Sequence, residues 1–186
     1  MMSTLSATPG QTVGPFYGYA LPIAGGNELV PPRTPGAIRL HGQITDGEGT
    51  PVPDALLEIW QADANGVVPT ETGSLCRDGW TFTGWGRAGT DGEGRYTFST
   101  VKPGPVQPGS APFIAMTVFA RGLLNRLFTR VYLPGPHLAD EPLLSSLPVD
   151  RRESLIAVPD DDGLRFDIRL QGEHETVFLR FPGHMP

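Results

Sequence analysis

The sequence holds few side chains that could bind a metal ion. Its four histidines are His41, His137, His174 and His184. No two of them stand two positions apart, as a strand would need to present both to one metal, or four apart, as a helix would need. The single cysteine, Cys76, excludes thiolate clusters, and the three aspartates at 160–162 are typical of a solvated turn. Residue types and spacing therefore predict no metal site.

Catalysis by a nucleophile or by paired carboxylates also lacks a motif. There is no G-x-S-x-G elbow, and no Ser/His/Asp triad can be recognised from scattered residues. The D-G-E-G strings at 46–49 and 91–94 resemble each other, but turn chemistry accounts for both. Taken alone, these patterns predict no catalytic apparatus in this chain.

Composition limits the fold and the partners. The 186 residues carry a net charge of −6, and thirteen arginines with the lone Lys102 are scattered without a basic block, which argues against nucleic acid as a partner. Gly 24 and Pro 20 make up about a quarter of the chain, which nearly excludes a helical bundle. The longest nearly apolar run, residues 113–120, is too short to span a membrane. The first residues show no secretory signal, so we expect a cytoplasmic protein.

Alternating apolar and polar residues predict the elements that must position any site. At least seven short strands are expected, and they lie at residues 38–45, 56–60, 95–99, 113–120, 129–133, 166–170 and 177–181. The last two should pair as a hairpin around Gly172. Residues 67–90 are expected to form an irregular loop, and residues 138–147 the best candidate for a short helix.

This pattern predicts an all-β protein, an antiparallel β-sandwich with little helix. Residues 1–36 have many prolines and glycines and no sustained periodicity, so they are expected to form an extended N-terminal arm. The sandwich domain would then comprise residues 37–186. The sequence shows no internal repeat.

Six strings in the same order along most of the chain resemble one family, the intradiol ring-cleaving dioxygenases. The strings are QTVGPF (11–16), WQADANG (60–66), TVKPG (100–104), FARG (119–122), TRVY (129–132) and RFDIRLQG (165–172). Each string alone is weak evidence for this family, because a transthyretin-like binding module could also contain it. The resemblance implies a prealbumin-like β-sandwich.

The catalytic chains of that family hold Fe(III) with two tyrosines and a His-x-His pair, and this sequence departs at all four positions. The tyrosines would fall at Val68 and Val106, and the histidines at Phe113 and Ala115. None of these side chains offers an oxygen or nitrogen donor. We call Val68, Val106, Phe113 and Ala115 the lost-ligand positions, and we expect side chains to fill the pocket that they would line.

The resemblance also implies which residues of this chain would contact substrate. The N-terminal arm would reach over the iron site of a partner chain and line its pocket with Thr12, Gly14, Pro15 and Phe16. Arg130 would approach the same pocket and recognise a substrate carboxylate. The alternatives from the residues alone are an arm packed on its own domain and a surface arginine at a sheet edge. Arg121 is expected to be an interface or packing residue.

We therefore expect the iron-free chain of an obligate heteromer. Its partner would be an iron-binding β subunit, with Fe(III) bound by that partner and not by this chain. The reaction implied is O₂-dependent cleavage of 3,4-dihydroxybenzoate to 3-carboxy-cis,cis-muconate. The competing hypotheses are a chain that binds iron by itself, which the lost-ligand positions argue against, a non-catalytic transthyretin-like module, and a subunit acting on a related dihydroxylated aromatic.

Overall fold

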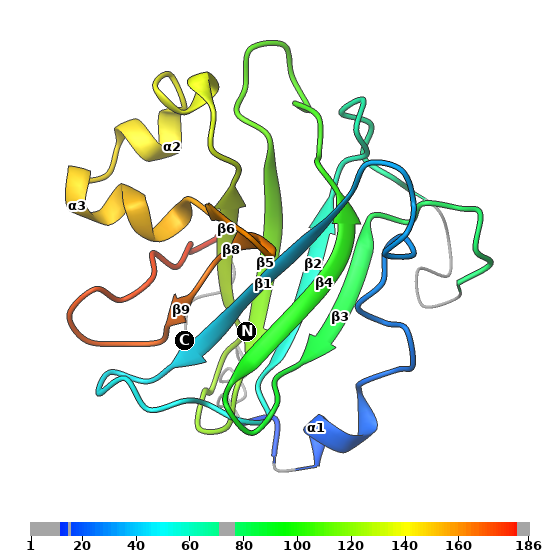
Figure 1. The fold of residues 1–186 in the computed structure, drawn as a ribbon. Coiled ribbons are helices and arrows are strands. Elements are labelled where there is room, and N and C mark those ends of the chain that lie inside the picture. Colours follow the sequence, from blue (N-terminus) through cyan, green and yellow to red (C-terminus); the bar gives the residue numbers. More distant parts are fainter. Residues whose placement is uncertain (1–11, 15, 71–76, 182–186) are drawn as a thin grey trace, which may run out of the picture.

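The computed structural model describes residues 12–14, 16–70 and 77–181, which form two β-sheets packed face to face (Figure 1). The first sheet has the order β4-β1-β8-β7, with β9 also pairing with β1, and the second has the order β3-β2-β5-β6. The strands are β1 (Ala37–Thr45), β2 (Leu56–Gln61), β3 (Trp85–Gly89), β4 (Arg95–Val101), β5 (Phe113–Phe119), β6 (Leu127–Tyr132), β7 (Val158–Asp160), β8 (Gly163–Arg165) and β9 (Ile168–Arg169). The predicted β-sandwich is confirmed.

Helix is confined to short pieces. They are α1 (Tyr17–Ala20), η1 (Pro136–Leu138), α2 (Pro142–Ser145), α3 (Val149–Arg152) and η2 (Glu153–Leu155). Figure 1 shows the pieces after β6, in yellow, gathered on one side of the sandwich away from α1. In the described part of the chain, no helix has the length and apolar character needed to cross a membrane.

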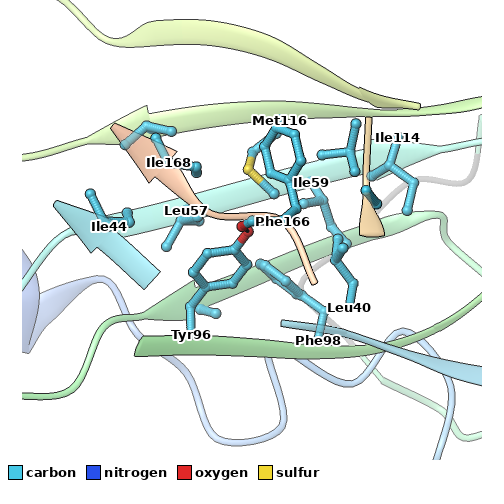
Figure 2. Close-up of a cluster of buried hydrophobic side chains, with 14 of the residues drawn as sticks. Leu40, Ile44, Leu57, Ile59, Tyr96, Phe98, Ile114, Met116, Phe166 and Ile168 are labelled. Atoms are coloured by element: carbon cyan, nitrogen blue, oxygen red, sulfur yellow. Dashed lines mark hydrogen bonds between the residues drawn. The ribbon is translucent and has the colours of Figure 1, made fainter. Parts of the chain in front are cut away.

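The core lies between the two sheets and explains why alternation predicted the strands. Every second side chain of β1 from Leu40 onward, and of β4 and β5, is buried. Figure 2 shows these side chains meeting in the interior, with the rings of Tyr96 and Phe98 among aliphatic side chains of the opposite sheet. The Tyr96 hydroxyl donates a hydrogen bond to the Phe166 carbonyl oxygen at 2.5 Å, so the polar end of this buried ring is satisfied.

Three expectations about elements are wrong. Residues 67–90 are not all irregular, since β3 pairs with β2 at their end. The single helix expected at 138–147 is instead the end of η1 followed by α2, because Pro142 starts a new helical turn. The final hairpin does not form either: β9 pairs in parallel with β1, and Leu179 makes an isolated bridge with Phe128 on β6.

The expected arm is shorter than its Pro/Gly composition indicated. Leu29 is buried in the core, and its backbone N–H donates to the Ser99 carbonyl oxygen at 2.8 Å. Ser99 in turn donates its backbone N–H to the Asn27 carbonyl oxygen, at 2.9 Å. Residues 27–29 therefore pack against β4 of their own domain. Whether the residues before them pack on a partner chain stays a prediction.

Candidate functional site

Two of the lost-ligand positions lie on neighbouring loops at one end of the sandwich. The Gly104 backbone N–H donates to the Asp63 carbonyl oxygen at 2.7 Å, which holds the loop after β4 against the loop after β2. Val68 and Val106 follow these contacts and are 39% and 49% exposed. In the isolated chain the two valines therefore do not fill a buried pocket, contrary to our expectation.

The other two lost-ligand positions lie on β5. Phe113 and Ala115 are half-buried and point to the face of the sheet opposite the core, because the residues between and after them, Ile114 and Met116, are fully buried. The register places Phe113 opposite Tyr132 and Ala115 opposite Arg130 on β6. Arg130 is thus a direct cross-strand neighbour of a lost-ligand position.

The lost-ligand positions do not fit a ferric ion. Two valines, a phenylalanine and an alanine supply no side-chain oxygen, nitrogen or sulfur donor. Across residues 12–14, 16–70 and 77–181, no three His, Cys, Asp or Glu side chains gather in a group that could hold a metal. We accordingly assign this chain no step that requires iron bound to its own residues.

Arg130 is held in place by three neighbours. Its guanidinium carbon lies 4.1 Å from the centre of the Phe113 ring, within the range of a cation–π interaction. Its Nη1 donates to the Tyr132 hydroxyl at 3.0 Å and lies 3.8 Å from Oε1 of Glu141. The side chain remains 31% exposed, so the guanidinium is fixed and still reachable from solvent.

Tyr132 links Arg130 to the buried carboxylate of Glu141. Its hydroxyl donates to Glu141 Oε1 at 3.0 Å. Burial raises the pKa of Tyr132 above its ordinary value, and although neighbouring Arg130 lowers it, Glu141 raises it further. The hydroxyl thus keeps its proton at neutral pH, and it can accept from Arg130 while it donates to Glu141. We call Phe113, Arg130, Tyr132 and Glu141 the Arg130 cluster.

The described arm residues lie apart from this cluster. Thr12 is exposed, Phe16 is 76% exposed, and Gly14 adopts a left-handed conformation at φ +77° with open space around it. Pro15 lies outside the described residues. Val13 lines a small cavity together with the turn between β5 and β6. Among the described residues, the structure shows no contact between the arm and Arg130.

The arm is anchored where α1 begins. Tyr17 is buried. Arg121 Nε lies 2.8 Å from Oδ2 of Asp54, and the negative charge of the Asp54 carboxylate acts on the Tyr17 hydroxyl. Burial, and after it the Asp54 carboxylate, raises the pKa of Tyr17 to about 12. Arg121 therefore acts within its own domain in this structure.

This anchor predicts a loss of stability at alkaline pH. The Tyr17 hydroxyl ionises near pH 10 in the unfolded chain and near pH 12 in the folded chain. Its contribution to the free energy of unfolding is therefore fully present below pH 10 and is lost as the pH rises through 12. At pH 11 the loss should be about 1 kcal/mol. Urea unfolding should show that the free energy of unfolding of the native chain is lower at pH 11 than at pH 8, and that this difference is smaller in Tyr17→Phe. Identical pH dependence in both proteins would contradict the role of Tyr17.

The sequence singles out Arg130 and Phe113 separately, but it gives no sign of their contact or of the two residues that complete the cluster. Tyr132 lies in the TRVY string, two positions after Arg130. This spacing puts both side chains on one face of a strand but does not indicate that both point toward Glu141. Glu141 lies between two short helical turns and carries no sequence signal of burial.

Comparison with known proteins gives one consistent result. Residues 14–172 match a protein family described as dioxygenase. The chain is 40% identical to the protocatechuate 3,4-dioxygenase alpha chain of Burkholderia cepacia, over 96% of this chain and 99% of that one. It is 41% identical to the alpha chain of the same name from Pseudomonas putida, over 95% and 98%. Among solved structures, the dioxygenase domain of a carbohydrate-binding fusion protein from Streptomyces sp. SirexAA-E superposes with a TM-score of 0.59 at 27% identity, over 90% of this chain and 99% of that one.

Proposed function

Because the chain belongs to the intradiol dioxygenase family, we propose that it is the iron-free α subunit of a protocatechuate 3,4-dioxygenase. The observation that carries the proposal is the match to α chains over nearly the whole length of both proteins. The donor-free side chains at the lost-ligand positions support it, because a chain of this family that cannot bind Fe(III) itself needs a partner that does. The partner is an iron-binding β subunit.

In the complex this chain would shape the substrate pocket and supply charge. The substrate, 3,4-dihydroxybenzoate, carries a ring carboxylate, and Arg130 offers a permanently charged, planar group with a fixed orientation. Thr12, Gly14, Pro15 and Phe16 would line the same pocket once the β subunit is in place. The ring would be opened by O₂ between its two hydroxylated carbons to give 3-carboxy-cis,cis-muconate.

Exposed apolar side chains support an obligate partner. Trp60, on the outer face of the central strand β2, is 52% exposed, and Val68 and Val106 on the adjacent loops are exposed as well. Large apolar side chains gathered at one end of a sheet are typical of a surface that another chain covers. Both subunits are therefore expected to aggregate less readily in the complex than alone.

Iron content tests the proposal. We expect the chain purified alone to contain no stoichiometric iron and to have no colour. Co-expressed with an iron-binding β subunit, it should yield a red-brown complex that consumes O₂ with 3,4-dihydroxybenzoate. Stoichiometric iron in the isolated chain would contradict the assignment of the lost-ligand positions. A chain that associates with no β subunit would instead favour a stand-alone binding module.

A further inference from the structure

The lost-ligand positions differ from a metal site in more than their missing donor atoms. Phe113 and Ala115 share the outer face of β5, and the register places Arg130 on β6 directly opposite Ala115. The Arg130 guanidinium carbon also lies 4.1 Å from the centre of the Phe113 ring. A guanidinium carries a permanent positive charge and offers only N–H donors, so it cannot act as a metal ligand. A cation therefore already lies against two of the four positions.

The Phe113 ring is itself held in place by apolar packing. It lies 5.8 Å, centre to centre, from the ring of Tyr132. It also packs against a second buried cluster, which is formed by Ala111, Tyr132, Leu144 and Leu155. The face of an aromatic ring attracts a guanidinium, so this packing fixes a platform for Arg130. The position that would hold a histidine ligand thus supports a positive charge instead.

Glu141 keeps the guanidinium from turning away. Arg130 Nη1 lies 3.8 Å from Glu141 Oε1 and donates to the Tyr132 hydroxyl at 3.0 Å. That hydroxyl donates to the same Glu141 oxygen at 3.0 Å. A buried carboxylate that loses its paired cation is left uncompensated, at a high cost in stability. Arg130 is therefore fixed by contacts within this chain and needs no ligand to hold it.

The Arg130–Glu141 pair has no net charge, but its two charges face different surroundings. The Glu141 side chain is only 9% exposed, whereas that of Arg130 is 31% exposed and rests on Phe113. The positive end of the pair is therefore the end that meets the lost-ligand positions on β5. A metal cation placed at these positions would lie close to a like charge, and repulsion at such short range is strong in a half-buried setting.

We propose that Arg130, held by the other members of the Arg130 cluster, closes the lost-ligand positions of this chain to metal ions. The missing donors explain why the native chain cannot bind iron, and the arginine adds that restoring the donors would not by itself restore binding. This inference concerns the chain alone, so it holds or fails independently of the proposed function. In a complex with an iron-binding subunit, it would leave only the partner's site for the metal.

Iron loading of the full chain tests the proposal. The restored variant carries the four family ligands as Val68→Tyr, Val106→Tyr, Phe113→His and Ala115→His. After incubation with ferric citrate and desalting, we expect this variant to retain no stoichiometric iron and to show no tyrosinate colour. Adding Arg130→Gln should raise the retained iron about tenfold or more, because the like charge is gone. Arg95→Gln removes the same charge from an exposed position on β4 and, as the matched control, should leave the iron content unchanged.

Glu141 needs a control of its own, because Arg130→Gln leaves its carboxylate without a paired cation. The restored variant with both Arg130→Gln and Glu141→Gln should retain as much iron as the one with Arg130→Gln alone. A gain that disappears when Glu141→Gln is added would assign the metal to the freed carboxylate and overturn the proposal. Equal iron content with and without Arg130→Gln, whether high or low, would overturn it as well.

A smaller change keeps the test decisive if the two tyrosines unfold the restored variant. Phe113→His/Ala115→His alone creates a His-x-His pair on β5, a spacing that presents both imidazoles to one metal. Tyr132 and Glu141 still hold Arg130 in this variant. Calorimetric titration with Zn²⁺ should give a Kd about tenfold lower when Arg130→Gln is added, after thermal unfolding has verified that both variants are folded. An unchanged Kd would overturn the proposal.

Discussion

Replacing Arg130 by alanine is expected to raise KM for 3,4-dihydroxybenzoate about 100-fold in the complex with the β subunit. The guanidinium is already oriented by Phe113 and Tyr132, so the interaction with the carboxylate would be formed at little entropic cost. Its removal would also leave the substrate carboxylate without its ion-pair partner. For catechol, which lacks the carboxylate, KM should change less than about twofold.

Steady-state kinetics with both substrates make this measurement. Arg130→Lys should fall between the native protein and Arg130→Ala, because lysine keeps the charge but not the planar fork. Arg95→Ala is a suitable control, since Arg95 is exposed on β4 in the other sheet. Equal increases for catechol and 3,4-dihydroxybenzoate would show that Arg130 supports the pocket without reading the carboxylate.

The second large effect concerns Gly42, in the middle of β1. The backbone between β8 and β9 passes so close to β1 that a Cβ at position 42 would collide with the Phe166 carbonyl oxygen and lie 3.1 Å from the Tyr96 hydroxyl. That carbonyl accepts the hydrogen bond from Tyr96. Gly42→Ala should therefore separate the backbones and weaken this bond, at a cost of about 3 kcal/mol in the free energy of unfolding.

Thermal unfolding checks the effect, which corresponds to a Tm lower by roughly 6 to 12 °C for a chain of this size. The control is Gly92→Ala, because a Cβ at position 92 would meet no other atom within 4 Å and the residue needs no positive φ. It should unfold within about 0.5 kcal/mol of the native chain. A Gly42→Ala variant as stable as the control would mean that the strands can separate without cost.

Strand positions could be predicted because burial on one face leaves a period-two pattern in the residues themselves. Leu40 and Ile44 on β1, and Tyr96 and Phe98 on β4, alternate with polar residues, and the structure buries all four. Pairing could not be predicted in the same way. Residues 166–170 and 177–181 have the alternation of a hairpin, yet β9 joins β1 and Leu179 bridges to β6, since pairing depends on which edges are free in space.

The lost-ligand positions and the substrate role of Arg130 are predictions from strings of residues, because a resemblance assigns roles to residues by their place along the chain. Such a resemblance gives no information about which side chains touch. Phe113 and Arg130 lie on different strands and became neighbours only through the register of β5 and β6. The strand predicted at 56–60 gives no sign of the direction in which Trp60 points, and only the structure shows that its side chain faces outward and is 52% exposed.

The sequence by itself thus determined the all-β class, most strands, the family and the absence of donor atoms at the lost-ligand positions, because each follows from local residue type and order. The tertiary structure decided that Glu141 is buried, that Tyr132 links it to Arg130 and that Gly42 has no room for a side chain. These features arise where segments distant in the chain meet. Their cause is close packing, which depends on distances between atoms that no periodicity encodes.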